Sequence, residues 1–491
     1  MARYWQIFCR PSSVLRLTYE KLGINIRRMM SYVKEASIAA TARLMIANQS
    51  MHWFMVGIIF PVLSLIILGK GMDYLQLGLL MALFSGTVVL AELPSGALSD
   101  LLGRKKIYLV ALCLSFAGGA ILLVAKSFLT LAFGFTAMGL ARAFASGSVE
   151  ALFIDRLYAL KPGIDLQPIL AKAGMAVPLA LGLASLAGGY LPILQAAFFT
   201  GIGGPYTLNL LAYMTLALCQ FALSAALVPA ELSRPVRGRG ARTPTTGIIS
   251  LFESLAGAFR TGLSNRTIRL LLLGGLAWGF SIAGLEQFWQ PRVRELAFPD
   301  TSSAILGFLG FGYFAASALG SMVSTPLFRL SSRRYGLFLG FARLLMGFLY
   351  IGLAATGRLS GFSILYILCF AANGLSSSPE GTLLNEELEP DSRATMLSLS
   401  SLFLQLGGLA GSIALGALAR SYSIPLAWTL AALALIISSS LYFALPRRSV
   451  QAGSAAAAAA EGFCDSAMTL ALALDGEAAA GSALKKEEQA P

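Results

Sequence analysis

The chain has 491 residues, of which 56% are hydrophobic and 12% are charged. Soluble domains carry about 45–50% apolar and about 25% charged residues, so this composition argues against a soluble enzyme, a soluble nucleic-acid-binding protein and a disordered chain. The net charge is +13, and a single histidine, His52, makes histidine-based catalysis and zinc ligation improbable. The cysteines are scattered and form no CxxC pair, so they indicate neither a disulfide framework nor a metal site. We therefore expect a polytopic membrane protein.

Twelve apolar segments have the length of about 20 residues that a helix needs to cross a bilayer. They cover residues 51–69, 75–98, 107–125, 128–150, 168–191, 205–229, 268–290, 303–328, 335–356, 360–384, 394–418 and 425–445. The connections between them are short and rich in Gly, Pro, Ser and charged residues, as breakers of helices should be. The predicted fold class is all-α, with twelve transmembrane helices in two six-helix bundles.

The longest connection, residues 230–267, leaves six spans on each side and is interpreted as a cytoplasmic linker. It separates an N-terminal bundle (48–229) from a C-terminal bundle (268–446). Residues 1–47 are basic and lack the uninterrupted apolar core of a signal peptide. They are either a cytoplasmic amphipathic extension or sequence upstream of a later start at Met45 or Met51. Residues 447–491 form a low-complexity tail, which we expect to be poorly ordered.

The basic residues indicate the orientation in the membrane, because loops rich in Lys and Arg stay in the cytoplasm. With both termini placed inside, 28 of the 37 Lys and Arg residues fall in inner segments and 6 in outer loops. The basicity is therefore a record of topology in the plasma (inner) membrane, and no nucleic-acid partner is expected. The expected surroundings are the lipid bilayer.

The two halves of the chain resemble each other weakly. A shift of 230 residues lays Ser146, Ser148, Glu150, Asp155 and Arg104 onto Ser376, Ser378, Glu380, Asn385 and Arg334. Many secondary transporters consist of paired six-helix halves, with the substrate site at their interface.

The segment between spans two and three, residues 96–106, has the most specific spacing in the chain. Gly96 would let the end of span two approach a neighbouring helix closely. Asp100 is placed to bridge to a nearby cation or to face the N-terminus of another helix. The basic cluster that starts at Arg104 would hold this tight turn in the cytoplasm.

This segment resembles the signature loop of the major facilitator superfamily, which reads roughly G-x-L-A-D-R-x-G-R-[KR]. The chain matches that pattern at Gly96, Leu98, Asp100, Gly103, Arg104 and Lys105, and departs from it at Ser99 and Leu101. With the twelve spans and the central linker, the resemblance covers about residues 48–446. It implies that Asp100 and Arg104 belong to a charge network that locks the cytoplasmic gate while the protein faces outward.

Two further stretches, residues 142–155 and 385–398, resemble a poorly characterised bacterial, efflux-like branch of the same family. They place carboxylates and a cation at cytoplasmic span ends of opposite halves: Glu150, Asp155, Glu386, Glu387 and Arg393. We expect pairs between the halves when the inner gate closes, with Asp155 and Arg393 as one such pair. The alternative is that these are solvated loop charges.

Span five carries part of a signature found in drug/proton antiporters, which ends G-P-x-x-G-G. Gly188 and Gly189 match its last two residues, whereas the Gly-Pro pair is absent. The mismatch weakens an antiporter assignment without excluding it, because helix packing needs only small residues there.

Charges inside spans are the candidates for substrate binding or proton coupling, because each costs about 2.5–3.5 kcal/mol to insert at a helix centre. Glu92 and Arg142 fall at similar depth in one half. A carboxylate there could exchange a proton as its surroundings alternate between wet and dry. A static Glu–Arg pair that staples helices together is an equal alternative.

Two further charges lie in the other half. Glu286 would line the outer mouth or simply sit at the membrane interface, and Arg343 would anchor an anionic substrate or pair with a neighbouring carboxylate. Gln405 and Asn373 are further polar candidates for a central cavity. Aromatic residues that would line a pocket, or simply pack, are Trp278, Phe288 and Trp289.

The chain has no GxxxxGK[ST] phosphate loop and no nucleophile–base constellation, so neither an ATP-driven pump nor an enzyme is expected, and no cofactor or metal. We expect a monomeric secondary transporter that works by alternating access, with a proton as coupling ion, and exports a small amphipathic molecule. A proton-coupled importer or uniporter is the alternative within this class. A non-transporting sensor or scaffold on the same fold is the alternative outside it.

Overall fold

The computed structural model describes residues 26–146, 148–199, 201, 203–229, 262, 264–297, 303–331, 334–388 and 393–446. The elements of the first half are α3 (Ile26–Ile59), α4 (Leu63–Leu68), α5 (Tyr74–Leu102), α6 (Arg104–Val124), α7 (Phe128–Ala145), α8 (Ser148–Leu160), α9 (Gln167–Phe198) and α10 (Thr207–Leu227). Those of the second half are α12 (Arg266–Leu296), α13 (Ala304–Leu330), α14 (Tyr335–Ala355), α15 (Leu359–Glu386), α16 (Arg393–Ser421) and α17 (Ile424–Phe443). The predicted all-α fold is confirmed.

Within these ranges, eleven helical segments are long and apolar enough to cross a membrane, and they coincide with predicted spans two to twelve. The first predicted span, 51–69, is divided between the end of α3 and the short helix α4. Residues 26–47, expected to belong to a separate extension, form one continuous helix with the start of that span. Most of predicted linker 230–267 and the whole predicted tail 447–491 lie outside the described residues.

Pro61 explains the interruption of the first span, because proline has no backbone N–H and cannot continue the hydrogen-bond ladder. The break leaves carbonyl groups of the last turn of α3 without helical donors. Asn209 of α10 donates its Nδ2 to the Ile58 carbonyl at 3.1 Å. Gln290 of α12 donates its Nε2 to the Phe60 carbonyl at 3.0 Å, so the break also supplies a contact between the halves.

The predicted fourth span also ends differently from the expectation. α7 ends at Ala145, Ser146 has an extended backbone, and a new helix, α8, begins at Ser148. The predicted connection 151–167 is helical over its first part, because α8 continues to Leu160. This short helix packs against α3 and α6 and brings Asp155 to the start of α6.

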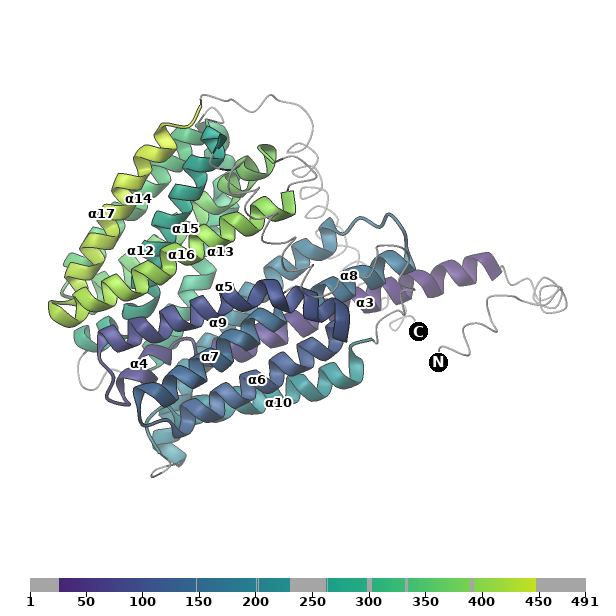
Figure 1. The fold of residues 1–491 in the computed structure, drawn as a ribbon, viewed down its shortest axis with the longest axis horizontal. Coiled ribbons are helices and arrows are strands. Elements are labelled where there is room, and N and C mark those ends of the chain that lie inside the picture. Colours follow the sequence, from purple (N-terminus) through teal and green to yellow (C-terminus); the bar gives the residue numbers. More distant parts are fainter. Residues whose placement is uncertain are drawn as a thin grey trace, which may run out of the picture.

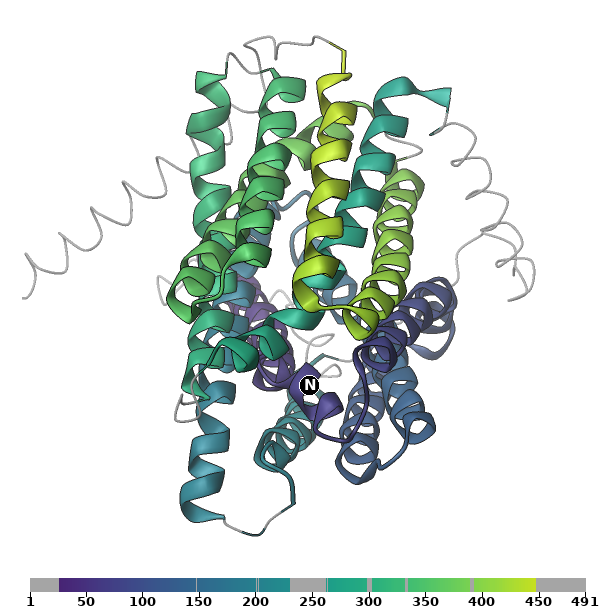
Figure 2. The same ribbon diagram turned by 90° about the vertical axis from the view of Figure 1, so that its left-hand side faces the viewer.

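The two halves form two helical bundles that meet at one end and diverge toward the other (Figure 1). Helix α5 packs against α16, and α9 packs against α13, so each half contributes two helices to the interface. Figure 2 shows the second bundle standing above the first, with α5 crossing beneath α16. We name the end that carries the α5–α6 turn the basic end, and the other the opposite end.

Candidate functional site

Polar contacts between the halves gather at the opposite end. Asp73, the N-cap of α5, forms a 3.1 Å ion pair with Arg420 in the last turn of α16. The Tyr74 hydroxyl donates to the Glu295 carboxylate at 3.1 Å, and Arg294 donates to the Tyr206 hydroxyl at 3.2 Å. Each contact joins one residue of the first half to one of the second, so the halves are held together at this end.

Glycines let the helices of the two halves pack closely at the same end. A Cβ at Gly78 of α5 would overlap the Ser412 carbonyl of α16, and one at Gly189 of α9 would overlap the backbone of Gly307 of α13. Gly188 faces the Ile58 carbonyl within the first half. Span five therefore needs small residues at both glycines of the partial antiporter signature, as predicted.

A cavity of about 320 Å³ opens at the basic end, within the first half. It is lined by Glu92, Ser95, Gly96, Ser99, Arg104, Ser146 and Ser148. Glu92 is exposed, and the Ser146 hydroxyl donates to its carboxylate over 3.5 Å. No described atom lies within 4 Å of a Cβ placed at Gly96, so the described residues show no close approach at this glycine in this conformation.

The turn between α5 and α6 is fixed by one glycine and two cations. Gly103 has φ 103°, a region that favours glycine, and joins the two helices by itself. Arg104 forms a 2.8 Å ion pair with Asp155 of α8. Lys105 donates to the carbonyls of Ala225 and Val228, both at 2.7 Å, at the end of α10. The turn is thus fastened to two other helices of its own half.

The remaining predicted gate residues are distributed as follows. Glu150 is exposed in the first turn of α8, where the helix dipole favours a carboxylate. In the second half, Tyr335 donates its hydroxyl to Glu386 at 3.0 Å, and Asn265 donates to Glu387 at 3.4 Å. The side chains of Asp100 and Arg393 lie outside the described part of the structure. The predicted Asp155–Arg393 pair therefore stays a prediction, and in this conformation Asp155 is paired with Arg104.

Arg142 of α7 adjoins a chain of polar contacts in the first half. Its guanidinium lies 4.8 Å from the centre of the Trp53 ring and close enough to Glu92 for electrostatic attraction, but the two form no ion pair within the described residues. The sequence-based alternative of a static Glu92–Arg142 pair is therefore not the arrangement seen.

The chain of contacts continues from Trp53 to the neighbouring His52. The Tyr108 hydroxyl lies 3.3 Å from His52 Nδ1 and accepts a hydrogen bond from Gln220 Nε2 at 3.0 Å. Gln220 Nε2 also reaches the Asn48 carbonyl at 3.1 Å, and Asn48 Nδ2 donates to the Ser224 hydroxyl at 2.9 Å. These contacts tie α3, α6 and α10 together. The sequence shows that each of these residues is a polar residue within a span. Which of them contact one another depends on how each helix is rotated about its axis.

Arg343 is buried at the centre of a second network, in the other half. It forms a 2.6 Å ion pair with Glu380 of α15, and the Tyr442 hydroxyl donates to the same carboxylate at 2.7 Å. The guanidinium also lies 5.8 Å from the Trp278 ring and 5.5 Å from the Tyr442 ring. Trp278 donates its indole N–H to Asn373 at 2.7 Å. Of the two roles considered for Arg343, the structure places it as the partner of a carboxylate.

Glu380 and Tyr442 were not predicted as site residues. Glu380 follows Pro379 inside a predicted span and aligns with Glu150 in the 230-residue repeat, which were the two signals that could have identified it. Tyr442 lies at the end of span twelve, where nothing in the sequence distinguishes it from an ordinary interfacial tyrosine.

Of the remaining predicted residues, the aromatic ones are packed in the interior and the polar or charged ones are at least partly accessible. Phe288 and Trp289 are fully buried and pack against Tyr74 and Phe60 of the first half, so they help to close the opposite end. Gln405 is half-buried on α16, one turn before the residue that faces Gly86. Glu286 is exposed and accepts a 2.8 Å hydrogen bond from the Tyr313 hydroxyl.

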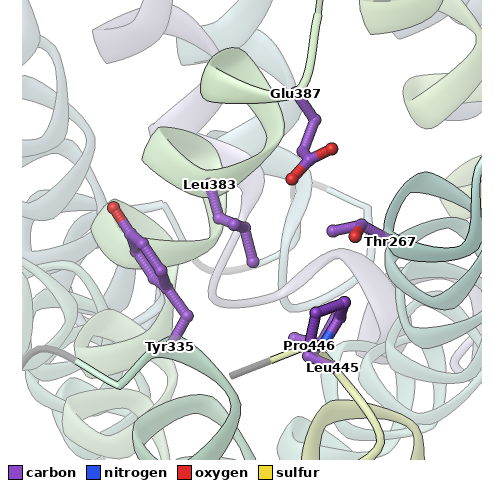
Figure 3. Close-up of a pocket in the computed structure, with 6 residues that line it drawn as sticks. All are labelled: Thr267, Tyr335, Leu383, Glu387, Leu445 and Pro446. Atoms are coloured by element: carbon purple, nitrogen blue, oxygen red, sulfur yellow. The ribbon is translucent and has the colours of Figure 1, made fainter. Parts of the chain in front are cut away.

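A second hollow lies at the basic end of the second half (Figure 3). It is lined by Thr267, Tyr335, Leu383, Glu387, Leu445 and Pro446. Its volume of about 10 Å³ is enough for one water molecule, so it is not a candidate substrate site.

The chain matches the family model described as Major Facilitator Superfamily over residues 45–298. A search of curated proteins finds no match. Among solved structures, the fold resembles a bacterial homologue of the human lysosomal transporter Spinster, in an inward-facing and unoccupied conformation (TM-score 0.66, 17% identity, 83% of this chain and 96% of that one). It also resembles the nucleoside transporter NupG (TM-score 0.65, 13% identity, 82% and 98%) and an auto-inhibited POT family peptide transporter (TM-score 0.62, 14% identity, 85% and 99%).

Proposed function

The chain belongs to the major facilitator superfamily, and from this premise we propose that it is a proton-coupled exporter of small amphipathic molecules that works by alternating access. The observation that carries the proposal is the asymmetry between the two ends. One ion pair, several hydrogen bonds and closely packed glycines join the halves at the opposite end, whereas among the described residues the inter-half glycine contacts along α5 reach no further toward the basic end than Gly86. This asymmetry is what one of two alternating states requires.

The orientation of the protein follows from the charges at the basic end. Arg104, Lys105 and Lys106 lie there, and loops rich in Lys and Arg stay in the cytoplasm. In a plasma membrane, with both termini in the cytoplasm, this state is therefore open inward. It is the state in which an exporter loads its cargo.

Glu92 supports the choice of a proton as the coupling ion. It is an exposed carboxylate in the cavity at the basic end, with the Ser146 hydroxyl beside it and Arg142 close by without a direct ion pair. Closing this end would remove water from the carboxylate, and a charge inside a span is costly without water or a partner. A proton taken up in one state and released in the other would couple the halves to the pH gradient.

The purified chain in proteoliposomes should move at least one compound of a small panel when a pH gradient is imposed. The panel is ethidium, carboxyfluorescein and chloramphenicol, which are a cation, an anion and a neutral molecule. Glu92→Gln should abolish the dependence of flux on the pH gradient while leaving exchange between compartments of equal pH, because glutamine cannot carry the proton. Asp165→Asn, at an exposed loop carboxylate, is the matched control. Absence of flux for all three compounds contradicts transport, and an unchanged pH dependence in Glu92→Gln contradicts its coupling role.

Asp155 and Arg393 provide a test of the gate itself. If they pair when the basic end closes, Asp155→Arg and Arg393→Asp should each reduce flux, and the double exchange should restore part of it. The expected loss is about tenfold, because a like-charge contact replaces an ion pair. Asp155 also holds Arg104 in this conformation, so thermal stability of each variant is measured alongside flux. A double exchange that restores stability but no flux would show that the pair does not form.

A further inference from the structure

Glu286 is an exposed residue within an otherwise buried stretch of α12. Its side chain is exposed, whereas the residues on either side of it, from Ser281 to Pro291, are buried. The Tyr313 hydroxyl of α13 nevertheless donates to its carboxylate at 2.8 Å, so this face of α12 is turned toward another helix of the protein. A charged group in a span is costly unless it meets a partner or water, so the exposure of this one carboxylate requires an explanation.

No cation of the described chain neutralises this carboxylate. The ion pairs in the described residues join Arg104 to Asp155, Arg292 to Glu295, Arg343 to Glu380 and Arg420 to Asp73, and none includes Glu286. Its hydrogen-bond donor is the hydroxyl of Tyr313, which is a neutral group. The negative charge is therefore available to a ligand.

Aromatic rings gather around Tyr313, whose hydroxyl donates to this carboxylate. We define the aromatic group as Phe60, Tyr313 and Phe314, all half-buried and therefore partly accessible. The Tyr313 ring lies 4.5 Å from that of Phe314 and 5.5 Å from that of Phe60, measured between centroids. Phe370 packs behind Tyr313, with its ring centroid at 3.8 Å. The faces of such rings attract organic cations, and their area accommodates apolar substituents.

The site lies where the two halves meet. Phe60 belongs to the first half, and Tyr313 and Glu286 to the second. Gln290, one turn after Glu286 on the same face of α12, donates to the Phe60 carbonyl and so marks the closed end of the interface. A ligand that contacts the aromatic group would therefore touch both halves, as the cargo of an alternating-access protein must.

We propose that Glu286 and the aromatic group of Phe60, Tyr313 and Phe314 bind an organic cation that carries apolar substituents. The proposal rests on the proposed function in taking this ligand as the transported cargo, and it names its chemical class. An anionic cargo would lack a partner here, because the buried Arg343 of this half is already paired with Glu380.

Binding of tetraphenylphosphonium and tetraphenylborate to the purified full chain tests this proposal, since the two ions have the same shape and opposite charge. At alkaline pH the chain should bind radiolabelled tetraphenylphosphonium and discriminate against tetraphenylborate. Glu286→Gln should weaken cation binding about tenfold or more, the effect of losing one charge-assisted contact. Tyr313→Leu should weaken it about fivefold through loss of one ring face. Glu286→Asp should stay within a few-fold, and Asp165→Asn should bind like the wild type.

Equal binding of the two ions, unchanged cation binding in Glu286→Gln, or no cation binding by the wild type would each overturn the proposal. If Glu286→Gln fails to fold, the comparison of the two ions on the wild type decides. The proteoliposome panel separates this proposal from the proposed function. Flux of carboxyfluorescein or chloramphenicol without binding of tetraphenylphosphonium would support the proposed transport function and contradict the cation site. Cation binding without flux of any compound would support the cation site and contradict the transport function.

Discussion

Replacing Gly96 by leucine is expected to reduce flux about 10- to 100-fold while leaving the protein folded. Gly96 lies 18 residues after Gly78 on α5, which is about five helical turns and therefore the same face. Gly78 packs against Ser412 of α16, and α16 runs antiparallel, so the position that would meet Gly96 on closure is near Ala394. Extra methylenes forced into such a contact cost about 1–3 kcal/mol, which lowers the closing equilibrium by the stated factor.

The same change should not harm the conformation described here, because no atom of the described residues lies within 4 Å of a Cβ at Gly96 and leucine favours a helix more than glycine does. Flux of the panel compounds and thermal stability are measured together. Gly357→Leu, at an exposed glycine in the turn before α15 with equally open surroundings, is the matched control. Normal flux in Gly96→Leu would show that α5 and α16 do not approach at the basic end.

The largest effect on stability is expected at Arg343. Arg343→Met leaves the Glu380 carboxylate without its cation at a site where Arg343 is 4% exposed. Breaking a buried ion pair from one side costs about 3–5 kcal/mol, whereas replacing both partners by apolar residues is often neutral. The double variant Arg343→Met/Glu380→Met should therefore recover most of the loss. Tyr442→Phe, which removes only the hydroxyl that donates to Glu380, should cost about 1 kcal/mol.

Thermal unfolding of the purified variants in detergent measures these differences. Arg358→Met, at an exposed arginine before α15, serves as a control for the loss of a positive charge from this half. If the single and double variants at Arg343 and Glu380 are equally destabilised, the ion pair is not the reason for the burial of Arg343. If the double variant is stable but shows no flux, Arg343 or Glu380 takes part in substrate binding.

Much of the fold could be predicted because a bilayer leaves few options. Every backbone group in lipid must be satisfied internally, so apolar runs of about 20 residues become helices, and length and hydropathy predict α5 to α7, α9, α10 and α12 to α17. The break at Pro61 and the separate helix α8 were missed. Both occur inside or beside apolar sequence, where hydropathy does not reveal where a backbone turns.

The candidate site was less predictable, because its contacts depend on how each helix is rotated and on which state the protein occupies. The sequence identified Arg343 as a charge within a span but not Glu380 or Tyr442, which reach it from α15 and α17. For the closed gate it predicts a pair between Asp155 and Arg393 of the other half, which stays a prediction, and in this state Asp155 is paired with Arg104. A sequence encodes both states at once, and partners that change between states cannot be read from it.

Distances between spin labels on the two halves test alternating access most directly. One pair, Leu102→Cys and Leu330→Cys, spans the basic end, and another, Val124→Cys and Tyr422→Cys, spans the opposite end; all four positions are exposed. The native cysteines are first replaced. We predict two populations of label distances at each end, one long and one short, with the distance at the basic end short when that at the opposite end is long. The ratio of the two populations should shift with pH. In Gly96→Leu, only the long distance should remain at the basic end. A single distance at each end, unchanged by pH and by Gly96→Leu, would contradict alternating access.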